Sequence, residues 1–286
     1  MRTDNELKQL LTQIKDNDYS LPAEIDMESI IADMLKYVGH TDGELRDGLI
    51  YSTFGEWADR GTISPTQMKH VLDTSLKESH LFFGVGERGT DSVFTRAFSS
   101  LLVALTLAMH DEAPFLMDKD IREIKEVVMR YVGMEKDYRG YVDGKGWAHA
   151  VAHIADALFN IAGCGKAVDI EGEYNIGRDG LLEVLEAVKL LICNNEFVYQ
   201  AEEDERLAAA CMVVIWRKIL TNEDIINWID SFELKKMNWG GSIPGDYYLR
   251  VNKKHFIRSL YFKLLADGNY EEICTHILGL LLEKED

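Results

Sequence analysis

Residues 146–163 read GWAHAVAHIADALFNIAG, a stretch without Lys or Glu. At about 100° per residue, its large apolar side chains fall on one side of a helix: Trp147, Val151, Ile154, Leu158 and Ile161. The polar side chains fall on the opposite side, within a stripe about 60° wide: His149, His153, Asp156 and Asn160. Alanines fill both flanks, where a solvent-facing helix normally carries Lys and Glu. We therefore predict an inner helix packed between two neighbours, with its polar stripe lining a concave groove.

The same kind of helix recurs along the chain. Charge-poor helices are expected at residues 43–58, 94–109, 146–162, 205–219 and 254–266, and charge-rich amphipathic helices at 65–77, 119–131, 179–193, 222–233 and 270–284. The charge-poor helices begin roughly 50 residues apart, close to the period of HEAT-type or armadillo-type repeats. Alternating buried and solvated helices at this period predict an all-α fold, an α-α superhelix of stacked helical hairpins. A compact helical bundle is the alternative.

We expect a single domain over residues 1–286. It divides into N-terminal helices at 1–40, a core at 41–266 and a C-terminal helix at 267–286. Two segments rich in Gly and polar residues, at 163–179 and 235–251, are expected to be long loops. The start of one amphipathic helix is marked by Ser64, Pro65 and Gln67, the residue types of a capping box with proline at the first helical position.

The composition narrows the class of partner. The formal net charge is −18, so nucleic acid and anionic membranes are poor candidate partners. The four cysteines contain no CxxC pair, which favours buried reduced thiols. The N-terminal residues lack the apolar core of a signal peptide, and no long apolar run indicates a membrane span. We therefore predict a soluble cytoplasmic protein, whose oligomeric state the sequence leaves open.

The pair His149 and His153 could bind one transition metal from adjacent turns of a helix. A zinc protease would also need Glu directly after the first His, where this chain has Ala150. Asp156 lies about 10 Å along the helix axis from His149, so it suits orienting His153 rather than binding the same ion. A third ligand would have to come from another helix or from residues 137–143. The sequence favours a hydrogen-bonded polar network without a cofactor, with a divalent transition metal as the alternative.

Neighbouring helices extend the candidate groove. Each of the four other charge-poor helices has an arginine near its start: Arg46, Arg96, Arg206 and Arg258. Asp47 follows Arg46 directly and is a further candidate. Asp137, Arg139 and Trp147 lie in the polar, glycine-rich entry to the His helix. The glycines of residues 82–91 could form an anion-binding turn at the start of the Arg96 helix. A ladder of internal Asp–Arg pairs between repeats is the structural alternative to a binding groove.

Several phrases of this chain occur together in a known family. They are Leu45-Arg46-Asp47, Gly86-Glu87, Thr90 to Phe94 with Arg96, Arg139-Gly140, GKGWAHA with His153 and Asp156, EDERLA at 203–208, and Asn252 with FIRSLY at 256–261. The chain resembles, from about Asp42 to Leu265, the uncharacterised bacterial domain of unknown function family 2785. The resemblance implies one continuous domain and no known reaction.

Three hypotheses follow for function. The first is an α-solenoid that binds a protein, a peptide or a small polar ligand through its Arg, His and Asp groove. The second is a hydrolase that uses His149 and His153 as metal ligands or acid–base groups. The third is a structural scaffold whose polar stripes pair internally. The sequence favours the binding protein over the enzyme, because it contains no nucleophile elbow, P-loop or kinase signature.

Overall fold

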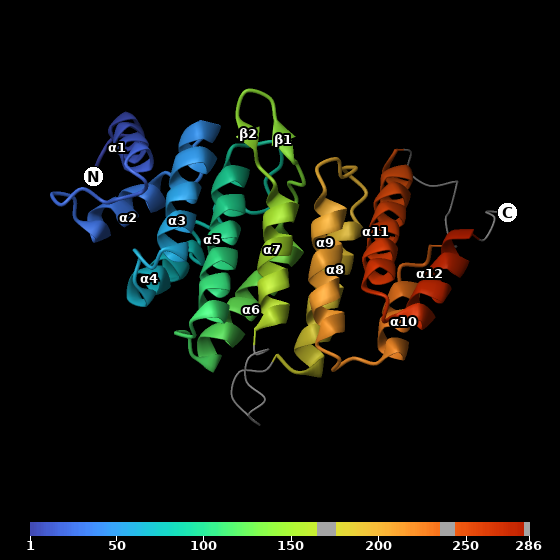
Figure 1. The fold of residues 1–286 in the computed structure, drawn as a ribbon. Helices are drawn as coiled ribbons and strands as arrows, with labels where there is room; N and C mark the ends of the chain where they lie inside the picture. Colours follow the sequence, from blue (N-terminus) through green and yellow to red (C-terminus); the bar gives the residue numbers. More distant parts are fainter. Residues whose placement is uncertain (165–175, 235–243, 283–286) are drawn as a thin grey trace.

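The computed structural model describes residues 1–164, 176–234 and 244–282. Over these residues the fold is all-α, as predicted, with one small β hairpin (Figure 1). The N-terminal helices are α1 (Asp4–Asp16) and α2 (Met27–Lys36), and the hairpin consists of β1 (Tyr141–Val142) and β2 (Gly146–Trp147). The remaining helices form two layers and a C-terminal helix, α12 (Glu271–Leu282), which packs against α10 and α11.

The front layer faces the viewer in Figure 1, and its helices stand side by side in sequence order. It contains the π-helix η1 (Glu44–Tyr51) with its continuation α3 (Ser52–Asp59), then α5 (Ser92–Glu112), α7 (Ala150–Gly163), α9 (Glu203–Trp216) and α11 (Gly245–Asp267). The back layer contains α4 (Pro65–Ser75), α6 (Asp118–Met134), α8 (Arg178–Ile192) and α10 (Asn222–Asp230). Helices α5, α7, α9 and α11 each contact the next in the layer.

The buried apolar side chains form two clusters that meet on α5. The first half of α5 supplies Phe94 and Phe98 to the N-terminal cluster, and its second half supplies Val103 and Leu107 to the larger C-terminal cluster. This helix is long and apolar enough to cross a membrane by length and composition, which we had not expected. Of its most apolar window, 78% is buried inside the structure, as in the core helix of a soluble protein.

The predicted start of α4 is confirmed, and the predicted start of α11 is wrong. The capping box at Ser64, with Pro65 next to it, begins α4 as predicted. The expected start of a helix at residue 254 was wrong, because α11 begins at Gly245, directly after Pro244. Proline is a common residue at the start of a helix, so Pro244 is the sequence signal for this start. Most of the two expected loops, at 165–175 and 235–243, lies outside the described residues.

The buried ion pair between Arg96 and Glu135 joins α5 to the end of α6. Two guanidinium nitrogens donate to Glu135, with Nε–Oε2 at 2.6 Å and Nη2–Oε1 at 2.9 Å. The third nitrogen donates to Ser92 Oγ and to the carbonyl oxygens of Phe83 and Gly84. Arg96 is fully buried, so it holds the 82–91 loop from beneath and does not line an open surface, contrary to our sequence prediction.

We expect Arg96→Ala to lower the free energy of unfolding by about 3–5 kcal/mol, because it leaves the Glu135 carboxylate buried and unpaired. Urea denaturation followed by circular dichroism measures this loss. The control is Arg130→Ala on α6, which removes an exposed pair with Glu78 and a contact with the ring of Phe82 and should cost about 2 kcal/mol or less. Equal losses of unfolding free energy in the two variants would show that the buried pair contributes no more to stability than an exposed pair.

Candidate functional site

Arg46 fixes the position of the β hairpin beside η1. Its Nη2 donates to the carbonyl oxygens of Lys145 and Trp147, each at 2.8 Å, and its Nη1 donates to His40 O. The guanidinium also lies 4.2 Å from the ring centroid of Phe94. Burial lowers the pKa of Arg46 to about 10, which still leaves it a cation at neutral pH. Arg46 is fully buried, so it supports the candidate site from below instead of lining it as we predicted.

The chain enters α7 through the hairpin, and this corrects the predicted helix at 146–162. Gly144 and Gly146 have φ values of +73° and +80°, which other residues rarely adopt. The carbonyl oxygen of Gly140 accepts hydrogen bonds from the backbone N–H groups of Ala148 and His149. His149 itself is left-handed at φ 50° and precedes the first residue of α7. Trp147 therefore lies on a strand, and it does not share the apolar side of the helix.

The hairpin places Trp147 directly over the histidine pair. The rings of Trp147 and His149 stack with centroids 4.1 Å apart, and those of His149 and His153 stack at 5.5 Å. Below them, Phe98 meets His153 edge-on at 4.9 Å, and Tyr51 meets Phe98 at 6.4 Å. These five rings form a continuous ladder from η1 across α5 to the hairpin, which we call the ring ladder.

Both histidines of the ring ladder are uncharged at neutral pH. Burial, followed by the nearby charge of Arg206, lowers the pKa of His149 to about 4. Burial and the neighbouring His149 lower the pKa of His153 to about 3. The Nδ1 of His153 lies 3.3 Å from the carbonyl oxygen of Ala97, which fixes the proton on Nδ1. The Nδ1 of His149 is buried and has no hydrogen-bond partner in the described structure.

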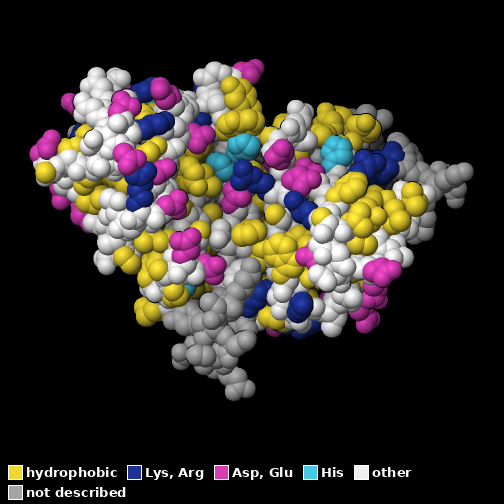
Figure 2. Space-filling model, viewed as in Figure 1, with side chains coloured by type: hydrophobic (Ala, Val, Ile, Leu, Met, Phe, Trp, Pro, Cys, Tyr) yellow, Lys and Arg dark blue, Asp and Glu magenta, His cyan; other side chains and the backbone are white. Residues whose placement is uncertain are grey.

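The charged side chains beside the ring ladder come from three helices. Arg206 on α9 donates to Asp156 on α7 at 2.6 Å, so Asp156 pairs with Arg206 and does not orient His153 as we had suggested. Burial raises the pKa of Asp156 and of the partly buried Asp47 on η1. Burial and then these two carboxylates raise the pKa of Tyr51 to about 12. The electrostatic coupling places these groups in one region, and Figure 2 shows His, basic and acidic side chains together near the middle of the front face.

The other predicted site residues form separate groups. Asp137, only 3% exposed, accepts hydrogen bonds from Arg139 and from the backbone N–H of Gly89. Arg139 also donates to the carbonyl oxygen of Thr90. The protein's own Asp137 carboxylate therefore binds the glycine-rich turn that the sequence indicated as one that could bind an anion. Arg258 is exposed on α11, and no contact among the described residues joins it to the ring ladder.

Tyr51 and Phe98 also belong to this region, and neither was among the site residues predicted from the sequence. Tyr51 stands four residues after Asp47, a spacing that would have placed it on the same face as that candidate. Phe98 carries no such signal, because an aromatic residue in an apolar helix normally indicates only the core. Within the described residues, no three His, Cys, Asp or Glu side chains are grouped so that they could hold a metal ion.

The fold and this region define an all-α protein of layered helices with an aromatic and charged cluster on one layer. Residues 81–262 match the family described as Protein of unknown function (DUF2785), and the chain belongs to this family. The identification from sequence is thus confirmed, although the match begins later than the Asp42 we had expected. It includes the hairpin, α7, Arg206 and Arg258, and leaves Arg46 and Asp47 outside. No curated protein and no solved structure matches the chain.

The lowered histidine pKa values predict acid-sensitive stability. As pH falls from about 6.5 toward 4, His149 and His153 become protonated in the unfolded chain but stay uncharged in the folded protein. The free energy of unfolding therefore falls through this pH range. We expect His153→Gln to lose less stability than the wild type between about pH 7 and about pH 5. Urea titrations at the two pH values measure the difference. His255→Gln, at an exposed position on α11, should behave as the wild type, and an unchanged pH dependence in His153→Gln would contradict the assignment.

Proposed function

We propose that this protein binds a peptide segment or a small polar ligand on the front layer, at the surface formed by Trp147, His149, Asp156 and Arg206. The observation that supports this most is the position of Trp147. Its indole is 39% exposed although it stacks on His149, and the hairpin that carries it is fixed by the buried Arg46. A large aromatic side chain held rigidly at a surface offers contact area at a small entropic cost, as in binding sites generally.

The side chains beside Trp147 suggest the chemistry of the ligand. Arg206 uses Nη1 to bind Asp156, and 46% of its side chain remains exposed, so its planar guanidinium is accessible to a carboxylate or amide oxygen. The Nδ1 of His149 is a buried polar atom that has no hydrogen-bond partner among the described residues. A ligand with a planar group for Trp147 and an oxygen acceptor for Arg206 fits this pair of side chains.

Ligand-observed NMR tests this proposal with a panel of aromatic carboxylates and short peptides that end in an aromatic residue. We expect hits whose saturation transfer disappears in Trp147→Ala and in Arg206→Ala, since these variants remove the stacking surface and the cation. Both side chains are partly exposed, so melting temperatures should stay near that of the wild type.

The matched controls are Trp216→Ala on α9 and Arg122→Ala on α6, which also remove an exposed indole and an exposed guanidinium. Hits should persist in both controls. If the site variants keep the same hits as the controls, or if the panel yields no hit, the proposed surface is not a ligand site.

One observation favours the rival hypothesis of a metal-dependent or acid–base hydrolase. Two uncharged imidazoles with one Nδ1 fixed by a backbone carbonyl resemble a preformed pair of metal ligands, because a ligand must be unprotonated. Elemental analysis of the untagged protein after incubation with zinc or manganese separates the two functions. If the protein binds only a polar ligand, we expect no stoichiometric metal ion in the wild type. If it is a metal-dependent hydrolase, the wild type should bind one ion and His149→Ala should lose it.

A further inference from the structure

Helix α11 is apolar on two faces. Its buried side packs into the core through Phe256, Leu260 and Leu264. Its exposed residues lie within about 100° of one another around the axis at 100° per residue: Tyr247, His255, Arg258, Phe262, Leu265 and Ala266. Phe262 is 64% exposed and Leu265 is 53% exposed. A helix with solvent on one face normally places polar residues there, so this exposed stripe indicates a contact surface.

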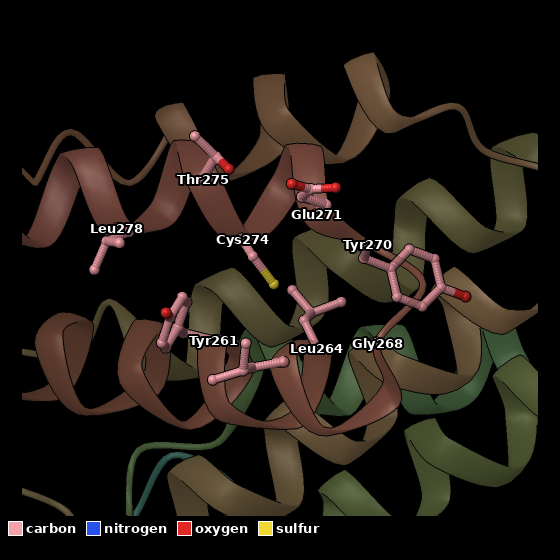
Figure 3. A pocket seen from close by; sticks show the side chains of 9 residues that line it. Tyr261, Leu264, Gly268, Tyr270, Glu271, Cys274, Thr275 and Leu278 are labelled. Carbon is pink, nitrogen blue, oxygen red and sulfur yellow. The ribbon is translucent and has the colours of Figure 1, made fainter.

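A cavity of about 330 Å³ adjoins the exposed stripe, between α11 and α12. Figure 3 shows Tyr261 and Leu264 of α11 facing Cys274 and Leu278 of α12 across it. Leu265 belongs to both the stripe and the cavity lining, so the two are continuous. The cavity is at the lower end of the size range of ligand pockets, which suits one or two large side chains of a partner.

The charge of α11 is opposite to that of the whole chain. The helix contains five Lys or Arg residues and two Asp residues, whereas the chain has a net charge of −18. Lys263 is paired with Glu205 on α9, and Glu271 lies in the cavity lining, so the inference depends on the charge of Arg258. Arg258 lies in the middle of the exposed stripe, and it forms no ion pair with any described residue. In Figure 2, hydrophobic side chains with basic ones beside them cover the right of the front face, over α11 and α12.

We infer that the exposed stripe of α11 and the adjoining cavity dock an acidic amphipathic helix of a protein partner. A large apolar side chain of the partner fills the cavity, and carboxylates one turn away bind Arg258. From Tyr247 to Leu265 the stripe is about 27 Å long, the length of a five-turn helix. Amphipathic helices bind apolar grooves through side chains spaced three or four residues apart, which is the geometry that α11 and α12 present.

Charge and size favour this occupant over the alternatives. Phe262 and Leu265 extend the apolar surface beyond the cavity, and a small molecule in the cavity would leave Phe262 uncovered. A symmetric contact with a second copy would bring two Arg258 side chains toward each other. The acidic body of the protein repels anionic membranes and nucleic acid at long range, and it repels a short acidic helix far less because few charges are involved.

Selection from a yeast-displayed library of helical peptides against the full chain tests the inference. We expect the enriched peptides to combine Asp or Glu with a large apolar residue three or four positions away. Arg258→Glu and Leu265→Asp should each weaken binding of an enriched peptide at least about tenfold, because the first reverses the charge of the stripe and the second places a carboxylate in the apolar lining of the cavity. Both side chains are exposed, so both variants should fold, and melting curves check this.

Two control variants make the same kinds of change on other helices. Leu190→Asp on α8 alters a leucine that is also 53% exposed, and Arg122→Glu reverses an exposed arginine on α6. Both should bind the peptide as the wild type does. The inference fails if no acidic peptide is enriched, or if the site and control variants bind equally. It also fails if sedimentation reveals a dimer that Leu265→Asp dissociates, or if the chain floats with phosphatidylserine vesicles through Arg258.

Discussion

The buried guanidinium of Arg46 is the contact on which the arrangement of the candidate site depends. It joins η1 to the backbone of the hairpin through the carbonyl oxygens of Lys145 and Trp147. No carboxylate among the described residues pairs with it, so backbone carbonyls and the faces of Phe94 and Phe98 compensate for its desolvation. A lysine at this position would carry a single ammonium group in place of the planar guanidinium. It could not donate at once to the carbonyl oxygen of His40 and to those of Lys145 and Trp147.

The helical parts of the fold were predictable because their signals are local. Apolar periodicity located α5 and α9 to within a few residues, and the capping box at Ser64 marked the start of α4. The hairpin before α7 was not predictable in the same way. Ala148 and His149 are compatible with a helix by propensity, and only the tertiary contacts with Gly140 and Arg46 hold them outside it.

The candidate site was predictable by residue type more than by geometry. His149, His153, Asp156 and Arg206 do lie in one region, since the two imidazoles stack and Arg206 donates to Asp156 on the same helix as His153. Arg46, Arg96, Arg206 and Arg258 all stand near the start of a charge-poor helix in the sequence, yet the first two are buried and the last two are exposed. Sequence periodicity gives the side of a helix on which a residue lies, but it does not say whether a loop from elsewhere covers that side.

The uncharged state of the ring ladder has a consequence for binding. His149 is uncharged because burial and Arg206 disfavour its protonated form. A ligand carboxylate that neutralises Arg206 removes one of these two causes and adds a negative charge nearby, so the imidazole becomes a stronger base. Occupation of the surface and proton uptake are then linked, and a ligand of this kind would bind more tightly as the pH falls toward the pKa of about 4 of His149.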